Sequence, residues 1–129
     1  VDAYWAGSPG NFVGLLFEAD ETNNNAYLFA VNTDSRVWLV SEVRNGTLSM
    51  LIPPTGNDAV LPGNAVNRLS AIRTGDFIRL QINGIPVGEL RGVRSDKLVL
   101  AGVAVASYTH QTITEARFDN FIYNLTYTE

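Results

Sequence analysis

The stretch from Arg68 to Leu90 decides the fold, and it reads Arg68-Leu-Ser-Ala-Ile-Arg-Thr-Gly75-Asp-Phe-Ile-Arg-Leu80-Gln-Ile-Asn-Gly84-Ile-Pro-Val-Gly-Glu-Leu90. Two turn signals, Thr74-Gly75-Asp76 and Asn83-Gly84, divide it into three strand-like segments. Asn-Gly is the strongest short hairpin signal, because a type I′ turn needs positive φ at both central residues. The stretch therefore predicts a three-stranded antiparallel meander.

Apolar and polar residues alternate between the two turns, which is the period of a strand with one buried face. Ile78, Leu80 and Ile82 share that face. A slip of one residue exposes all three, at roughly 1.5–3 kcal/mol each and roughly 5–9 kcal/mol together. This loss is comparable with the whole stability of a domain, roughly 5–15 kcal/mol. We therefore expect the register to be well fixed and the three side chains to be buried.

The rest of the chain continues as short strands separated by turn signals every 8–12 residues or so, without a helical period. The strand-like segments outside the meander are 1–6, 11–19, 26–32, 36–44, 47–52, 97–107 and 113–128. About nine short strands in 129 residues predict one all-β domain, spanning 1–129, built as an antiparallel β-sandwich.

Four local expectations follow from the pattern. Residues 11–19 are apolar almost throughout, which indicates burial on both faces, and residues 98–106 read as a buried strand of small residues. Residues 53–64 are rich in Pro and Gly, which predicts a surface loop over a sheet edge. The apolar parity changes in the last strand, which predicts a β-bulge at Asp119-Asn120.

Composition excludes several functional classes. A net charge of −4 with scattered basic residues argues against nucleic-acid or anionic-membrane binding. No apolar run approaches the roughly 18 residues of a membrane span, so no membrane insertion is expected. Without cysteine, with a single histidine and with no Asp-x-Asp-x-Asp run, we predict no metal and no cofactor.

Three motifs carry a resemblance to a known family. Residues 67–84 fit an N-x-L … G … I-x-L-x-x-N-G signature, Gly102-Val-Ala-Val105 fits a G-x-G-L-x-V strand, and Phe118-Asp-Asn-Phe121 fits a terminal F-D-N-F strand. Together they resemble the concanavalin A-like lectin/glucanase jelly rolls, which include laminin G-like modules, over residues 1–126. The resemblance implies a concanavalin A-like jelly roll; because the family holds lectins, hydrolases and structural domains, it implies little about activity.

Domains of this resemblance usually begin with further strands before the segment that matches 1–6. We therefore expect the usual first strands to be missing here. Three explanations are open: a preceding segment supplies these strands, the fold is an abridged variant, or a neighbouring subunit supplies a strand. An uncovered apolar edge favours association, so some cover is expected. The third explanation makes a homo-oligomer, a filament or a coat an expected assembly.

Aromatic side chains are the candidate carbohydrate-binding residues, since sugar rings offer apolar faces that stack on them. The candidates are Tyr4, Trp5 and Tyr108, together with His110, which is either an exposed loop histidine or a hydrogen-bonding partner of the sugar beside Tyr108. Tyr4 and Trp5 follow one another beside a Gly-Pro turn, where they equally fit a subunit contact. Trp38 lies in an apolar run and is expected in the core.

Glu18-Ala-Asp-Glu21 resembles the E-x-D-x-E motif of the glucanase branch, in which two carboxylates flank the scissile bond. Here Thr22 stands where the last carboxylate is needed, and Glu21 has the wrong parity. We therefore expect a solvated turn and predict no catalytic residue. Asn45 and Asn124 begin N-x-Thr triplets and are candidate N-glycosylation sites.

The sequence thus predicts a non-catalytic, extracellular or cell-surface module that binds glycans or mediates adhesion. The alternative is a structural subunit of an extracellular filament or coat, completed by a strand from its neighbour. A sugar-hydrolase-like domain is the third interpretation. The expected partner is a glycan or a neighbouring protein subunit.

Overall fold

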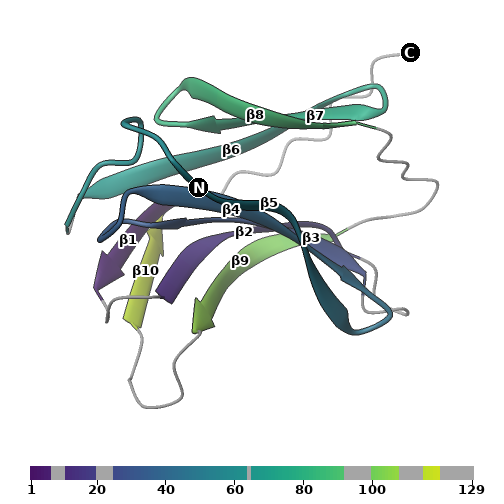
Figure 1. Ribbon diagram of the computed structural model, residues 1–129, viewed down its shortest axis with the longest axis horizontal. Helices are drawn as coiled ribbons and strands as arrows, with labels where there is room; N and C mark the ends of the chain where they lie inside the picture. Colours follow the sequence, from purple (N-terminus) through teal and green to yellow (C-terminus); the bar gives the residue numbers. More distant parts are fainter. Residues whose placement is uncertain (7–10, 20–24, 64, 92–99, 108–114, 120–129) are drawn as a thin grey trace.

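The computed structural model describes residues 1–6, 11–19, 25–63, 65–91, 100–107 and 115–119, and within these ranges it contains strands and no helix (Figure 1). The strands are β1 (Asp2–Ala6), β2 (Asn11–Ala19), β3 (Ala26–Asn32), β4 (Val37–Arg44), β5 (Thr47–Gly56), β6 (Val66–Thr74), β7 (Phe77–Ile82), β8 (Ile85–Arg91), β9 (Leu100–Ser107) and β10 (Glu115–Asp119).

The described strands form two antiparallel sheets that face each other. One sheet has the order β10-β1-β6-β7-β8, and the other has the order β5-β4-β3-β2-β9. Each sheet is built on a run of neighbours in the chain, β6 to β8 in the first and β2 to β5 in the second. β9 then returns beside β2, and β10 returns beside β1. The expectation of an all-β antiparallel sandwich is confirmed.

The central meander has the predicted geometry. β6, β7 and β8 pair in sequence order, and Ile78, Leu80 and Ile82 are buried in the core. The turn between β7 and β8 has φ of 53° at Asn83 and 80° at Gly84, as a type I′ turn requires. The register that alternation predicted is therefore the one found.

The main core lies between the two sheets. Trp38 from β4 packs its ring edge against Phe29 of β3, with the ring centroids 6.0 Å apart, and lies over Gly88 of the opposite sheet. A Cβ at Gly88 would stand 2.7 Å from Trp38 Cη2, so the absence of a side chain there makes room for the indole. The expectation that Trp38 is a core residue is confirmed.

A second apolar cluster occupies the other face of the β2–β4 region. Its buried members are Phe12, Leu28, Ala30 and Leu39. Leu28 and Ala30 alternate along β3 with Phe29 and Val31 of the main core, so β3 is buried on both faces. β2 shares this burial on both sides, as its nearly continuous apolar sequence predicted.

Two sequence expectations were wrong. Residues 53–56 belong to β5 instead of a loop, and the strand passes through Pro53-Pro54 because β5 is an edge strand. β9 was expected to be buried, but among its described side chains Val103 is exposed and residues 101, 102 and 104 are half-buried. These side chains are exposed because β9 is also an edge strand, on the opposite side of the same sheet from β5.

Candidate functional site

The predicted carbohydrate-binding residues are only partly placed. The backbones of Tyr4 and Trp5 lie in β1, where Tyr4 is opposite Arg117 and Val66, and Trp5 is opposite Ala116. Tyr108 and His110 lie outside the described residues, as do the sequon at Asn124 and half of the bulge expected at Asp119-Asn120. The four-residue carbohydrate site therefore stays a prediction.

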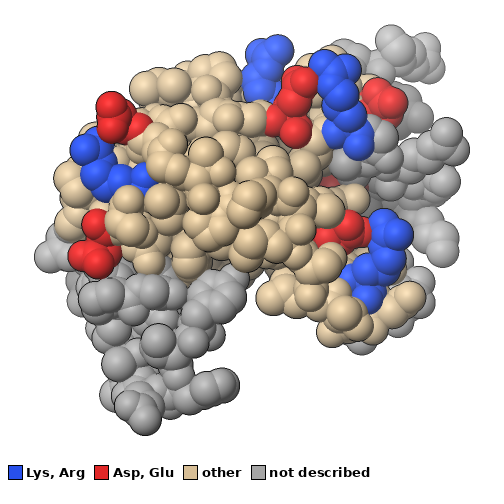
Figure 2. All heavy atoms as spheres, in the orientation of Figure 1, with Lys and Arg blue, Asp and Glu red and all other residues tan. Residues whose placement is uncertain are grey.

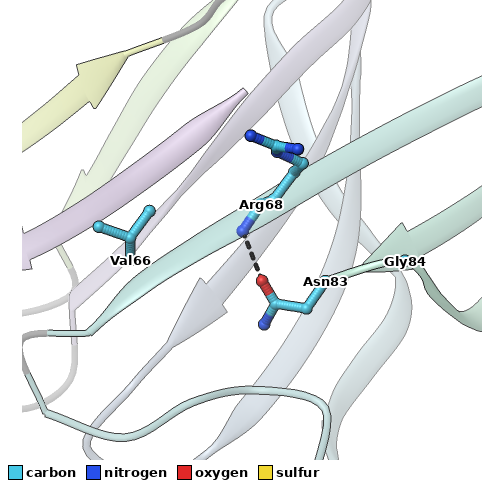
Figure 3. A pocket seen from close by; sticks show the side chains of 4 residues that line it. All are labelled: Val66, Arg68, Asn83 and Gly84. Atoms are coloured by element: carbon cyan, nitrogen blue, oxygen red, sulfur yellow. Dashed lines mark hydrogen bonds between the residues drawn. The ribbon is translucent and has the colours of Figure 1, made fainter.

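A shallow hollow of about 440 Å³ lies beside the position of Tyr4 in β1. It is lined by Val66, Arg68, Asn83 and Gly84 (Figure 3). The Asn83 side chain turns toward the backbone nitrogen of Arg68, whereas the Arg68 guanidinium points away from it. The hollow thus combines an apolar wall, a cationic group and an amide, but the amide is already engaged by the fold.

That amide belongs to a polar clamp, made by Asn67 and Asn83, which holds the loop that follows β5. Asn67 is fully buried; its Oδ1 accepts from the Leu61 backbone nitrogen at 2.8 Å, and its Nδ2 donates to the Leu61 oxygen at 3.0 Å. Asn83 Nδ2 donates to the Ala59 oxygen at 2.8 Å and to Asn67 Oδ1 at 3.0 Å. Both asparagines belong to the 67–84 motif of the sequence analysis. In this structure their side chains form hydrogen bonds with the backbone of the loop that follows β5.

Arg36 secures the same loop from the other sheet. It adopts a positive φ of 55° just before β4, its Nε donates to the Val60 oxygen, and its Nη2 donates to the Asp58 oxygen, each at 2.9 Å. The strand predicted to begin at residue 36 accordingly begins at Val37. The loop places Ala59 and Val60 in the main core, closing one end of the sandwich.

Glu18 was expected in a solvated turn, and this expectation was wrong. The residue lies in β2 with only 13% of its side chain exposed, and its Oε1 is 3.1 Å from both Nε and Nη2 of Arg73 on β6. The pairing of β2 with β9 gains one residue on β2 between Leu16 and Ala19, and Glu18 has a φ of 52°. This bulge turns the carboxylate toward the opposite sheet, which simple alternation after the inward Phe17 would not do.

The Glu18–Arg73 pair lies in a charged corner with Tyr27, Glu42 and Arg44. Tyr27 stacks on Phe17 with centroids 5.7 Å apart, and Glu42 bonds Arg44. Burial, and after it the neighbouring Glu42 carboxylate, raises the pKa of Tyr27 above its ordinary value of 10.0. The carboxylates of Glu18 and Glu42 are both ion-paired. The Glu18–Arg73 pair links β2 to β6, and the Glu42–Arg44 pair lies along β4.

Charged side chains elsewhere in the described residues also stand in groups of opposite sign. Arg91 bonds Glu89, and Arg36 approaches Asp58. Figure 2 shows blue and red side chains next to one another around the margin of the visible face, with a broad uncharged surface between them. The described residues hold no cluster of three or more His, Asp or Glu that could bind a metal ion. The part of the chain that the structure describes contains no helix with the length and hydropathy of a membrane span.

Edge strand β5 presents three exposed large apolar side chains within four residues. Leu48, Met50 and Leu51 are exposed by 54%, 47% and 43%, and Thr47 to Gly56 carry no charge. The β4–β5 hairpin ends at the Asn45-Gly46 turn, whose φ angles of 51° and 79° match a type I′ turn, and Asn45 is exposed. Sequence reasoning missed this surface because it treated residues 53–64 as a loop that covers an edge.

Comparisons with protein-family profiles, with curated proteins and with solved structures found no match to this chain.

Proposed function

We propose that the chain is a non-catalytic adhesive module of an extracellular or cell-surface protein, and that it associates with a second copy of itself through β5. The observation that carries this proposal is the exposure of Leu48, Met50 and Leu51 on an uncharged edge strand. Edge strands offer unpaired backbone groups, and native proteins usually blunt them with charges, prolines or cover. On β5 these devices are confined to its second half, where the pairing with β4 is bulged between Met50 and Ile52 and again between Ile52 and Thr55, and where Pro53-Pro54 lie.

The backbone of β5 supports strand addition over residues 47–50, before the register shift between Met50 and Ile52. Arg44 and Thr47 flank a two-residue turn and are opposite one another, and Val43 is opposite Leu48. Backbone groups alternate in direction along an antiparallel ladder, so Leu48 and Met50 direct their N–H and C=O groups away from β4. A partner strand that bonds these groups also covers their exposed side chains.

Charge favours a second copy as that partner. Of the other three edges, β10 carries Glu115, Arg117 and Asp119, and β8 carries Glu89 and Arg91, whereas β9 (Leu100–Ser107) is uncharged like β5. β5 has no charge with which to select a charged peptide, and it meets an identical uncharged strand without repulsion across the contact. Antiparallel pairing of β5 with itself is also two-fold symmetric, which is the commonest form of closed assembly.

Glycan binding is the second candidate, supported by the hollow beside Tyr4 and by the resemblance to concanavalin A-like jelly rolls. That resemblance also gives the proposed fold family, and the return of β9 beside β2 and of β10 beside β1 is in keeping with a jelly roll. Tyr4 and Trp5, with Tyr108 and His110, are the residues proposed to stack on or bond the sugar.

Sedimentation velocity over a range of concentrations tests the association. We expect the unmodified chain to form a dimer and Leu48→Lys to remain monomeric, because a charge then has to enter the contact. Ile85→Lys is the matched control, since Ile85 is exposed by 51% on β8; it should dimerise like the unmodified chain. A monomeric unmodified chain, or a dimer that survives Leu48→Lys, would contradict the proposal.

A glycan array separates the two candidates. Glycan binding that is lost in Trp5→Ala but kept in Leu48→Lys would favour the glycan-binding module. An absence of glycan binding by both variants would count against it.

A further inference from the structure

The two Asn-Gly turns of this chain have nearly the same backbone. Asn45 and Gly46 have φ of 51° and 79°, and Asn83 and Gly84 have φ of 53° and 80°. Asn-Gly occurs in the sequence only at these two places. The turns therefore form a natural pair in which side-chain contacts differ while the local backbone stays constant.

The Asn83 side chain is held at both ends. Its Oδ1 accepts from the Arg68 backbone nitrogen at 2.9 Å, and its Nδ2 donates to the Ala59 oxygen and to Asn67 Oδ1. All three partners belong to β6 or to the clamped loop, which are fixed by the core. The carboxamide of Asn83 cannot rotate without breaking these three hydrogen bonds together.

The Asn45 side chain has no such restraint. It is exposed, and it makes no hydrogen bond to any residue that the structure describes. Its backbone nitrogen donates to Asn25 Oδ1 at 2.9 Å, which fixes the turn but leaves the carboxamide able to rotate. Apart from its two chain neighbours, Gly46 has no atom within 4 Å of the position that a Cβ would take, and the same holds for Gly84, so the two turns differ in the restraint on the asparagine side chain and not in the space beside the glycine.

We propose that Asn45 is a site of spontaneous deamidation and that the fold protects Asn83 from the same reaction. The backbone nitrogen of Gly46 attacks Cγ of Asn45, loses its proton, and forms a five-membered succinimide while Nδ2 leaves as ammonia. Water then opens either carbonyl of the ring and gives aspartate or isoaspartate. One water is consumed and one ammonia is released, with no oxidation or reduction.

The two sites differ in whether the asparagine side chain can rotate to bring its Cγ close to the following backbone nitrogen. Ring closure needs Cγ within attack distance of the following nitrogen, in an orientation that only a rotating side chain attains. At Asn83 that rotation costs three hydrogen bonds, two of them to backbone atoms held by the core. Since each contributes a net stabilisation of modest size, we expect Asn45 to react at least about tenfold faster than Asn83 in the folded chain.

The reaction changes the tip of the β4–β5 hairpin. Either product adds a negative charge beside an uncharged edge strand. Isoaspartate also routes the main chain through the side-chain methylene, so the two-residue turn no longer matches the twist of its strands. This inference stands on the turn geometry alone and does not depend on association through β5.

The test is a timed incubation of the folded chain at mildly alkaline pH, followed by peptide mapping with mass detection. The chain is produced without N-glycosylation, because a glycan at Asn45 occupies the leaving nitrogen. We expect the peptide with Asn45 to gain the mass of an amide-to-acid change and to yield isoaspartate. The peptide with Asn83 should stay unchanged over the same period.

Two controls make the result decisive. In urea, where the clamp is absent, both sites should react at similar rates, and Asn45→Gln should remove the fast phase from the folded chain. Equal rates at Asn45 and Asn83 in the folded chain would overturn the proposal. So would a folded Asn45 that stays intact while the same residue is converted in urea.

Discussion

Oε1 of Glu18 on β2 lies 3.1 Å from both Nε and Nη2 of Arg73 on β6, so one ion pair links the two sheets. Arg73 also donates from Nη1 to the Gly75 oxygen at 2.8 Å, which ties the pair to the β6–β7 turn. The other carboxylate oxygen, Glu18 Oε2, is buried without a hydrogen bond. The ion pair therefore depends on the bulge that turns the Glu18 side chain inward. It holds the end of β6 that precedes the β6–β7 turn against β2.

Glu18→Gln and Arg73→Gln should each lower the free energy of unfolding by about 1–3 kcal/mol, because each leaves a mostly buried charged group with a weaker partner. A double-mutant cycle in urea denaturation should give a coupling of about 0.5–3 kcal/mol.

Glu89 and Arg91 supply the matched control, since they also bond one another but are exposed by 44% and 76%. Their cycle should give a coupling of about 0–1 kcal/mol, as exposed pairs do. Equal couplings for the two pairs would mean that burial does not strengthen the link between the sheets.

Asn67→Ala should lower the free energy of unfolding by about 1–3 kcal/mol, because it strips hydrogen bonds from the Leu61 backbone. Limited proteolysis should then cut within residues 57–65 faster than in the unmodified chain. Thr55→Ala is the control, because Thr55 is exposed and its hydroxyl donates to the nearby Pro53 oxygen, and it should change stability by less than about 0.5 kcal/mol. Unchanged cleavage in Asn67→Ala would show that the loop is held by other contacts.

Stability should fall as the pH rises above 10.0, in part because of Tyr27. Its pKa is raised in the folded chain, so the unfolded chain loses this proton first and is favoured from pH 10.0 up to the raised value. The contribution is therefore present below pH 10.0 and is lost as the pH rises through the folded pKa. Tyr27→Phe should show a shallower decline when urea denaturation is repeated across this range; identical slopes would contradict the assignment.

Gly14→Ala should destabilise the chain by about 3 kcal/mol or more, since the new Cβ would lie 1.9 Å from the Phe29 backbone oxygen. Gly102, opposite Leu16 on neighbouring β9, has open space at the same position. Gly102→Ala should change stability by less than about 1 kcal/mol, in the stabilising direction. Thermal unfolding of both variants checks the contrast, and similar losses in both would show that strand entropy matters more than the clash.

The periodic parts of the sequence predicted the fold well. Alternation located β7, the Asn-Gly pair located its turn, and the apolar run of 11–19 predicted burial on both faces, because each rests on local backbone geometry. The sequence did not predict which strands lie at the edges of the sheets, because whether a strand has one neighbour or two depends on the arrangement of the whole sheet. This is why the length of β5 and the exposure of β9 were misjudged.

The candidate site was predicted less well. Glu18 reaches Arg73 only through an inserted residue, which reverses the side expected from its parity. The clamp needs Asn67 to bond Leu61, six residues earlier, and Asn83 to bond Ala59, 24 residues earlier, and no periodic pattern in the sequence predicts these contacts. The aromatic carbohydrate-binding candidates stay predictions.

The position of β1 has a consequence for synthesis on the ribosome. Asp2 is opposite Arg68 on one side and Asp119 on the other, so β1 lies between two strands that both follow it much later in the chain. The runs β2–β5 and β6–β8 join strands that emerge in succession and can pair early. β1 can pair with β6 once β6 has emerged, but it completes its ladder only when β10 has emerged, so closing this sheet is expected to be the slow, late event of folding.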